Sequence, residues 1–273
     1  MITAAKTAIL TPTHVILSPR SGGVTAVTSL GDDMFVTRFN RQQVEVYDAA
    51  TLSFQRCLVV LGLSTRTSGL AACSKSKCLY VSDHDNDCVH RVDLGGNNAV
   101  KKWSVARRSG DVSVNGEHNL IVACCLPSKL QEYTTHGSLV REIYLQADVT
   151  SPWHAIQLST GDYVVSQCTS PGAVSVVGVD GQVVRTYEES QTSGVGEMKY
   201  PASLAVTKND NVLVADTGNR ILSINSSLGS IQELPLSVDG GIEGLCLDES
   251  RGRLYVAYWS GDLQVFAFDE VRA

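Results

Sequence analysis

A short phrase recurs six times along the chain and constrains the fold more than any other feature. Each copy is an apolar run centred on valine, then a polar turn, then a second alternating run, as in LYVSDHDNDCVHRVD at Leu79 and VLVADTGNRILSIN at Val212. The anchor valines lie 45, 41, 43, 49 and 42 residues apart, at Val36, Val81, Val122, Val165, Val214 and Val256. Repeats of about forty residues that each hold several short strands are typical of a β-propeller. The sequence therefore predicts an all-β, six-bladed ring.

The repeat also predicts how the ring closes. We expect residues 1–273 to form a single domain, with blades at approximately 24–60, 67–105, 110–145, 151–188, 200–236 and 240–273. The last unit has only three strands of its own, whereas the N-terminal segment holds an extra strand, THVILS, at residues 13–18. We predict that this strand becomes the fourth, outer strand of the last blade, because pairing there closes the ring and covers an exposed edge.

Composition narrows the functional classes. The formal net charge is −6, with 18% charged and 43% apolar residues, so a packed core is available and a broadly basic, phosphate-binding surface is not. No run approaches the roughly 20 apolar residues that span a bilayer, and the N-terminus does not resemble a signal peptide. We expect a cytoplasmic protein without DNA or membrane partners. The eight cysteines are then predicted to be free thiols, with a disulfide between Cys73 and Cys78 left open.

One unit carries a recognisable motif. Residues 200–225, YPASLAVTKNDNVLVADTGNRILSIN, resemble an NHL repeat, including Pro201 at the entry and the Val-Ala-Asp-x-x-Asn-Arg phrase that ends at Arg220. Asp216 is expected to accept backbone N–H bonds in its turn, and Asn219 to adopt the left-handed conformation. Unit two keeps this pattern, but the other units carry different residues at the aspartate position, namely Arg38, Cys124, Gln167 and Tyr258. The resemblance implies a six-bladed propeller like the one that ends many TRIM-type ubiquitin ligases, where it would select the substrate.

The channel residues indicate little catalytic chemistry. The residues expected at the start of the six innermost strands are Val24, Ser68, Gly110, His154, Ala202 and Glu243. His154 and Glu243 are therefore the predicted polar channel residues. A central calcium ion needs more oxygen ligands than these supply, even if Asp111 turns inward. We expect no catalytic residue, no metal and no cofactor, and keep a metal-dependent lactonase or lyase as an alternative.

The loops on one face are the predicted binding surface. These loops enter the first strand of each blade or join its second and third strands, and they carry the candidate residues Arg38, Asn40, Arg41, Trp153, His154, Tyr258 and Trp259. Tryptophan, tyrosine and arginine are the usual anchors of protein interfaces, so we predict a protein or peptide partner, with packing of Trp153 between blades left open. Single-stranded RNA is the alternative, since it needs a positive groove with aromatic platforms. The nearby Asp83, Asp85 and Asp87 disfavour it.

Overall fold

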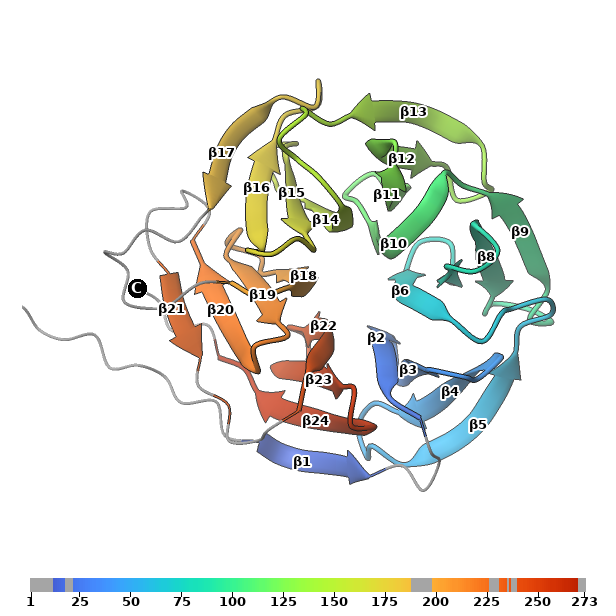
Figure 1. Ribbon diagram of the computed structural model, residues 1–273. Coiled ribbons are helices and arrows are strands. Elements are labelled where there is room, and N and C mark those ends of the chain that lie inside the picture. Colours follow the sequence, from blue (N-terminus) through green and yellow to red (C-terminus); the bar gives the residue numbers. More distant parts are fainter. Residues whose placement is uncertain are drawn as a thin grey trace, which may run out of the picture.

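The protein is a ring of six antiparallel sheets around a central axis (Figure 1). The computed structural model describes residues 12–17, 22–187, 198–225, 231–234, 236 and 240–269, and this part of the chain contains strands and turns but no helix. Each sheet has four strands, and the innermost strand of each lies at the axis. The predicted all-β, six-bladed architecture is confirmed.

The first three blades each use four consecutive strands. Blade 1 contains β2 (Val24–Leu30), β3 (Asp33–Arg38), β4 (Gln43–Asp48) and β5 (Phe54–Val59). Blade 2 contains β6 (Thr67–Cys73), β7 (Cys78–Asp83), β8 (Cys88–Asp93) and β9 (Val100–Ser104). Blade 3 contains β10 (Arg107–Val114), β11 (Leu120–Leu126), β12 (Ser128–Tyr133) and β13 (Leu139–Tyr144).

The last blade combines strands from both ends of the chain. Blade 4 contains β14 (Pro152–Gln157), β15 (Tyr163–Gln167), β16 (Ala173–Val177) and β17 (Val183–Tyr187). Blade 5 contains β18 (Pro201–Val206), β19 (Val212–Asp216), β20 (Arg220–Ile224) and β21 (Ile231–Leu234). Blade 6 contains β22 (Ile242–Asp248), β23 (Arg253–Tyr258) and β24 (Asp262–Ala267), and its outer strand is β1 (Pro12–Leu17).

The closing strand pairs as predicted. β1 runs antiparallel to β24, with Ile16 opposite Leu263 and Leu17 opposite Asp262. Ile16 also packs against the apolar cluster between blades 6 and 1. The first described strand therefore holds the last blade by backbone hydrogen bonds and by apolar contact.

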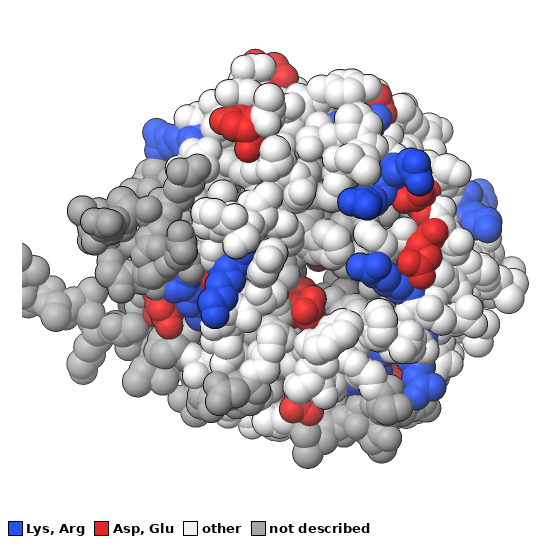
Figure 2. All heavy atoms as spheres, viewed as in Figure 1, with Lys and Arg blue, Asp and Glu red and all other residues white. Residues whose placement is uncertain are grey.

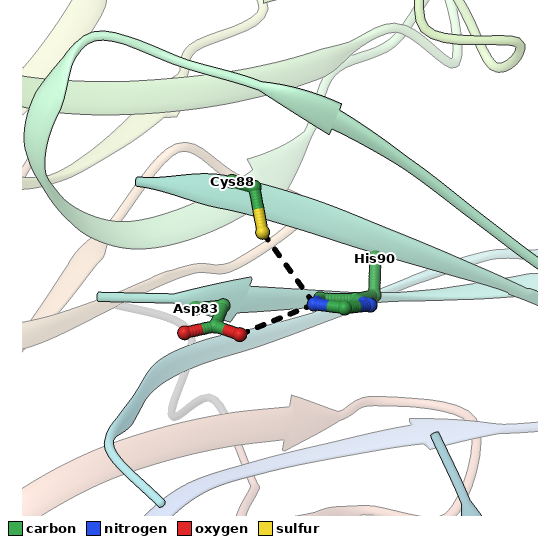
Figure 3. Close-up of side chains that lie close together, drawn as sticks. All are labelled: Asp83, Cys88 and His90. Atoms are coloured by element: carbon green, nitrogen blue, oxygen red, sulfur yellow. Dashed lines mark hydrogen bonds and ion pairs between the residues drawn. The ribbon is translucent and has the colours of Figure 1, made fainter. Parts of the chain in front are cut away.

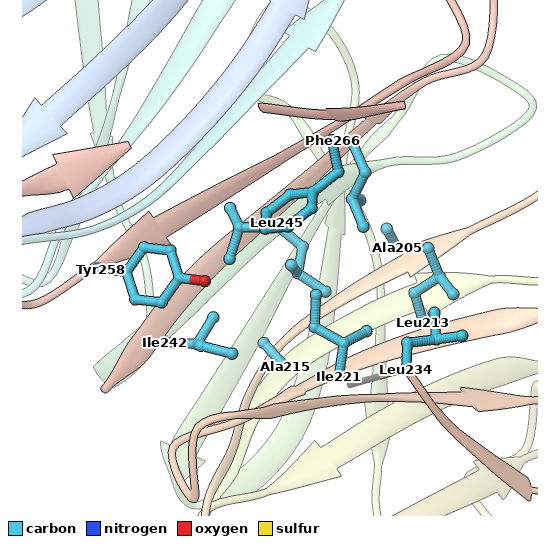
Figure 4. Close-up of a cluster of buried hydrophobic side chains, with 11 residues drawn as sticks. Ala205, Leu213, Ala215, Ile221, Leu234, Ile242, Leu245, Tyr258 and Phe266 are labelled. Atoms are coloured by element: carbon cyan, nitrogen blue, oxygen red, sulfur yellow. The ribbon is translucent and has the colours of Figure 1, made fainter. Parts of the chain in front are cut away.

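The cores lie between neighbouring blades. All six anchor valines are fully buried, because each one faces a neighbouring sheet. The cluster between blades 5 and 6 shows the pattern, with Leu213 and Ile221 of one blade packed against Leu245 and Phe266 of the next (Figure 4). The strands in the middle of the sheets, such as β7 and β19, are buried at every position, so each sheet has two buried faces, as a ring of face-packed sheets requires.

Polar side chains fix the loops that enter the blades. The Asp216 carboxylate accepts the N–H groups of Lys199 and Tyr200 at 3.0 and 2.9 Å, and also that of Gly218 at 3.4 Å. Asn219 adopts a φ of 66° in the same turn. Both features expected of the NHL-like phrase are therefore present in blade 5.

Blades without this aspartate use other acceptors for the same purpose. In blade 4 the Gln167 side chain accepts the N–H of Thr150 at 2.9 Å. In blade 3 the acceptor moves to the neighbouring strand, where Gln131 accepts the N–H of Ala106 at 2.7 Å. In blades 3 and 4 a glutamine side chain therefore holds the entering loop as aspartate does in blade 5.

Two further expectations concern cysteines and membranes. All eight cysteines are free thiols, as predicted, although Cys73 and Cys78 are direct cross-strand neighbours in β6 and β7. The described residues include no helix with the length and apolar character to cross a membrane.

Candidate functional site

A β-bulge at the start of every inner strand determines which side chains reach the channel mouth. The pairing between the first and second strands skips a residue in five blades and two residues in blade 3. The skipped residues are Thr25, Ser68, Gly110 with Asp111, Trp153, Ala202 and Glu243. Bulges often re-aim a side chain beside a functional site. Four of these residues, from four blades, line one cavity.

The bulges also correct the sequence alignment of the channel. The regular repeat predicts Val24 and His154 at the channel mouth, but the residues at the bulges are Thr25 and Trp153. Val24 is fully buried, and His154, which is 5% exposed, lies farther along the channel, in a hollow lined by residues of all six inner strands. The alternation of side chains along an ideal strand does not reveal a skipped residue, so the sequence pattern is displaced by one position in these two blades.

The cavity at the channel mouth has a volume of about 380 Å³. Besides the bulge residues, it is lined by Arg66 and Thr67 at the entry to β6, and by Phe39 and Trp259 in the turns that follow β3 and β23. Figure 2 shows the hollow at the centre of the ring, with acidic atoms on its β22 side and basic atoms on its β6 side. A volume of this size lies near the lower end of the range for small-ligand pockets. It suits one side chain or one small molecule.

Aromatic rings from three blades form much of the wall. Trp259 of blade 6 is 48% exposed, and its ring lies 5.0 Å from that of Phe39 in blade 1 at an angle of 54°. A side-chain carbon on Gly23 would come within 3.1 Å of the Trp259 ring, so the indole rests against glycine backbone. Trp153 of blade 4 is half-buried beside the His84 ring. The two tryptophans predicted for this face therefore share one cavity.

Glu243 is the acidic group of this cavity. Burial raises the pKa of Glu243 to about 7, because a partly desolvated carboxyl favours its neutral form. Among the described residues, none forms an ion pair or hydrogen bond with the Glu243 side chain within the usual distances. Arg66 lines the same cavity but is exposed and makes no ion pair with Glu243. The site therefore presents, among aromatic rings, a carboxyl group that no described residue pairs with.

The hydroxyl groups of the cavity wall are already paired with one another. Thr25 lies 3.0 Å from the Thr37 hydroxyl and 3.2 Å from the Thr67 hydroxyl. The Ser68 hydroxyl is 2.9 Å from the Ser82 hydroxyl and donates to the Gly110 carbonyl at 2.9 Å. These bonds join blade 1 to blade 2 and blade 2 to blade 3. Among the described side chains of the lining, Glu243 is consequently the hydrogen-bond acceptor that has no partner of its own.

His154 belongs to a separate network farther along the inner strands. Its Nδ1 accepts the N–H of Leu204 at 2.9 Å, which places the ring proton of the neutral form on Nε2. The Asp111 carboxyl lies 3.4 Å from the same Nδ1, and burial raises the pKa of Asp111 despite the opposing effect of His154. His154 also lines a second hollow, of about 200 Å³, whereas Glu243 lines the first. The two predicted channel residues therefore do not converge on a common ligand position.

Arg38 is buried rather than exposed on the binding face. Its side chain is only 1% exposed and donates from Nε to Glu45 at 2.9 Å. Nη1 donates to the carbonyls of Gly22 and Gly261 at 3.1 and 2.8 Å. Arg38 stands where other blades carry the loop-binding aspartate, and its guanidinium binds loop carbonyls where aspartate binds loop N–H groups. This position faces inward, so an exposed role for Arg38 is excluded by its burial.

Tyr258 occupies the same inward position in blade 6. It is fully buried beside Ile242 and Ala215, and its hydroxyl donates to the Gln264 side chain at 3.4 Å (Figure 4). It therefore contributes to the core and not to a contact surface. Asn40 is exposed, with a φ of 62°, and Arg41 is half-buried in the same turn. Neither residue lines the cavity.

One buried cluster outside the channel has metal-ligating side chains. Among the residues that the structure describes, Asp83, Cys88 and His90 are the group of three whose ligand atoms lie close together (Figure 3). The Asp83 carboxylate at 3.1 Å and the Cys88 sulfur at 3.5 Å both approach the same nitrogen, Nε2 of His90. A Cys-His-Asp catalytic arrangement requires them on opposite ring nitrogens. Burial also raises the pKa of the Cys88 thiol to about 11, which opposes thiolate chemistry.

This cluster instead holds the turn of blade 2. Burial alone would raise the pKa of Asp83, but hydrogen bonds from His90, Ser64 and Asn86 lower it well below its usual range. The N–H of Ser64 and the side-chain amide of Asn86 both donate to the same carboxylate oxygen at 2.9 Å. Asp83 therefore fixes the loop that enters its blade, as Asp216 does in blade 5.

Comparisons with known proteins identify the fold but no family. No family model matches the chain, and no curated protein matches it. A solved structure of a catalytically inactive virginiamycin B lyase from Staphylococcus aureus with quinupristin is similar, with a TM-score of 0.70 and 11% identity over 94% of this chain and 99% of that one. The WD40 β-propeller domain of Doa1 is similar with a TM-score of 0.66 and 13% identity, over 96% of this chain and 98% of that one. The hydrazine synthase of Kuenenia stuttgartiensis is similar with a TM-score of 0.64 and 19% identity, over 86% of this chain and 73% of that one.

By their names, two of these structures are enzymes and the third is a WD40 propeller domain. At identities below 25% they support the propeller fold alone, and the NHL and TRIM-type assignments are not confirmed by them. The function has to be argued from the channel mouth.

Proposed function

We propose that this propeller is a non-catalytic binding module that recognises a protein or peptide over the cavity at the channel mouth. The observation that carries this proposal is the convergence of Phe39, Trp153 and Trp259, from three different blades, on one cavity. Partly exposed aromatic residues beside a pocket are typical anchors of protein interfaces. The closed ring holds them in fixed positions, so little conformational entropy is lost on binding.

A binding role fits the site better than a catalytic one. The lyase similarity suggests an enzymatic alternative, but among the described residues that line the cavity Glu243 is the only carboxyl and none is a histidine, cysteine or lysine, and His154 lies in the other hollow. Acid–base catalysis usually needs two such groups within reach of one substrate. The binding proposal requires only the aromatic walls and one charge.

We extend the proposal to the biological setting suggested by the NHL-like phrase. The turns organised by Asp83 and Asp216 support that resemblance, and a TRIM-type ligase would use such a module to select its substrate. The free cysteines support a reducing compartment, and we place the protein in the cytoplasm.

A peptide selection tests the binding function directly. Random peptides displayed on phage are selected against the wild-type protein, and the enriched peptides are synthesised and their affinities measured by calorimetry. We expect Trp259→Ala to weaken binding by about tenfold or more, as truncation of an aromatic anchor does. The matched control is Phe54→Ala, which removes another partly exposed ring, 45% exposed, from the outer strand β5.

Two results would contradict the proposal. Peptides that bind equally well to the wild type and to Trp259→Ala would place recognition elsewhere. Salt-dependent binding of mixed single-stranded RNA, lost in Trp259→Ala while no peptide is enriched, would favour the RNA alternative.

A further inference from the structure

We propose that the cavity at the channel mouth binds an alkylated ammonium cation, such as the methylated lysine side chain of a peptide, between Glu243 and the aromatic rings of Trp153, Trp259 and Phe39. This inference deepens the proposed function, because it names the side chain that a partner would insert.

The charge of the site favours a cation. Glu243 lies in the cavity without an ion-pair partner among the described residues, and a positive ligand would pair with its carboxylate. Cations also bind to the faces of aromatic rings, most strongly to tryptophan. Glu243 and the two tryptophans come from blades 4 and 6, and Phe39 from blade 1, so the groups reach the cavity from several directions.

The hydrogen bonding of the wall favours an alkylated cation over a plain ammonium group. A lysine ammonium group has three N–H donors, all of which need acceptors when water is removed. The wall hydroxyls of Thr25, Thr67 and Ser68 are paired with one another or with blade residues, which leaves the Glu243 carboxyl to accept. A methylated ammonium group has fewer donors, and its methyl groups contact the rings instead. A guanidinium group, with five donors, fits least well.

Arg66 does not cancel this preference. Its side chain is exposed at the edge of the cavity, where water and salt screen its charge, whereas Glu243 is partly removed from water. Arg66 instead offers an ion pair to an acidic residue of the peptide that neighbours the methylated lysine. The variant Arg66→Ala therefore distinguishes two kinds of ligand: a ligand bound through its positive group keeps or gains affinity, and a ligand bound through an acidic group loses it.

The test uses two probes that differ by one atom type. N-acetyl trimethyllysine amide is the cation, and its analogue with carbon in place of the quaternary nitrogen has the same shape without the charge. Binding is followed by calorimetry and by tryptophan fluorescence, since two of the three tryptophans line the cavity. We expect the cation to bind about tenfold more tightly than its neutral analogue. We also expect Glu243→Gln to remove most of that difference.

Controls distinguish a changed site from a damaged fold. Trp259→Phe, which keeps a ring, is expected to retain most of the affinity, and Trp259→Ala to lose it. Phe54→Ala, on the outer strand β5, should leave binding of the cation unchanged, and Arg66→Ala should tighten it, because it removes a positive charge from the edge of the cavity. Equal affinity for the two probes, a preference for the cation that stays undiminished in Glu243→Gln, or binding lost in Arg66→Ala would each overturn the inference.

The two proposals can fail separately. Selected peptides that depend on Trp259 but contain no basic residue, with no binding of the cation probe, would keep the binding module and overturn the cation site. Binding of the cation probe that depends on Glu243, with no peptide selected, would keep the cation site and overturn recognition of peptides.

Discussion

The buried ion pair of Arg38 offers a quantitative test of how the ring is held together. Arg38 joins the two sides of the seam between blades 1 and 6, since it binds Glu45 in its own blade, Gly22 before that blade, and the Gly261 carbonyl in blade 6. Removing one partner of a buried ion pair costs about 3–5 kcal/mol. We therefore expect Arg38→Met to lower the free energy of unfolding by about 4 kcal/mol, measured by urea denaturation with an unchanged m-value.

A double-mutant cycle isolates the contribution of the pair. Glu45→Leu alone should also destabilise the protein by about 3–5 kcal/mol, because it leaves a guanidinium buried without a carboxylate. The double variant Arg38→Met/Glu45→Leu should cost only about 2 kcal/mol, mainly for the two loop carbonyls that lose a donor. The reasoning would be refuted by a loss below about 1 kcal/mol in Arg38→Met, or by additive losses in the double variant.

Three further predictions follow from other parts of the ring. Gly110→Ala would place its new carbon 2.1 Å from the backbone oxygen of Trp153 and should strongly lower the midpoint of thermal unfolding. The control Gly116→Ala, whose new carbon has no atom within 4 Å, should leave the midpoint nearly unchanged. Equal shifts in the two variants would contradict the close approach of blades 3 and 4 at Gly110. The folded-state pKa of Glu243 is raised from 4.5 to about 7, with Arg66 and Cys168 as nearby titratable groups, so protonation of Glu243 stabilises the fold at low pH and this stability is lost as pH rises from about 4.5 through 7. Glu243→Gln should therefore be more stable than the wild type at pH 8 and show no advantage at pH 4. Thermal unfolding at both pH values measures this difference. Burial raises the pKa of Cys124 to about 12, so mass spectrometry should find it unmodified by iodoacetamide at pH 8 until the protein is unfolded, and rapid labelling of the native protein would refute this.

The sequence predicts the architecture well because the architecture depends on repetition. The spacing of the anchor valines indicates a propeller repeat, and their number predicts the number of blades. The unmatched strand near the N-terminus predicts the pairing of β1 with β24. Both inferences use only period and alternation, which survive the large differences between units. The role of Asp216 in its turn could also be predicted, because an aspartate followed by glycine and asparagine commonly accepts N–H groups of its own turn.

The residues that line the candidate site were harder to predict from the sequence, for two physical reasons. A bulge shifts the channel position by one residue without changing the apolar pattern, so Trp153 replaces His154 at the mouth. Arg38 and Tyr258 also stand at the position of a buried aspartate, and this alignment was itself the signal that both would face inward. Phe39 and Arg66 lie in turns, where no periodicity indicates which residues meet across the ring.

The pairing of β1 with β24 also affects how the protein can be made. On the ribosome, residues 12–17 are synthesised before every blade, yet their partner at residues 262–267 is synthesised after all the others. The hydrogen-bonding groups of β1 therefore meet their partner only after blades 1 to 5 and most of blade 6 have been synthesised. During that interval a chaperone, or another nascent chain with a free edge, can compete for them.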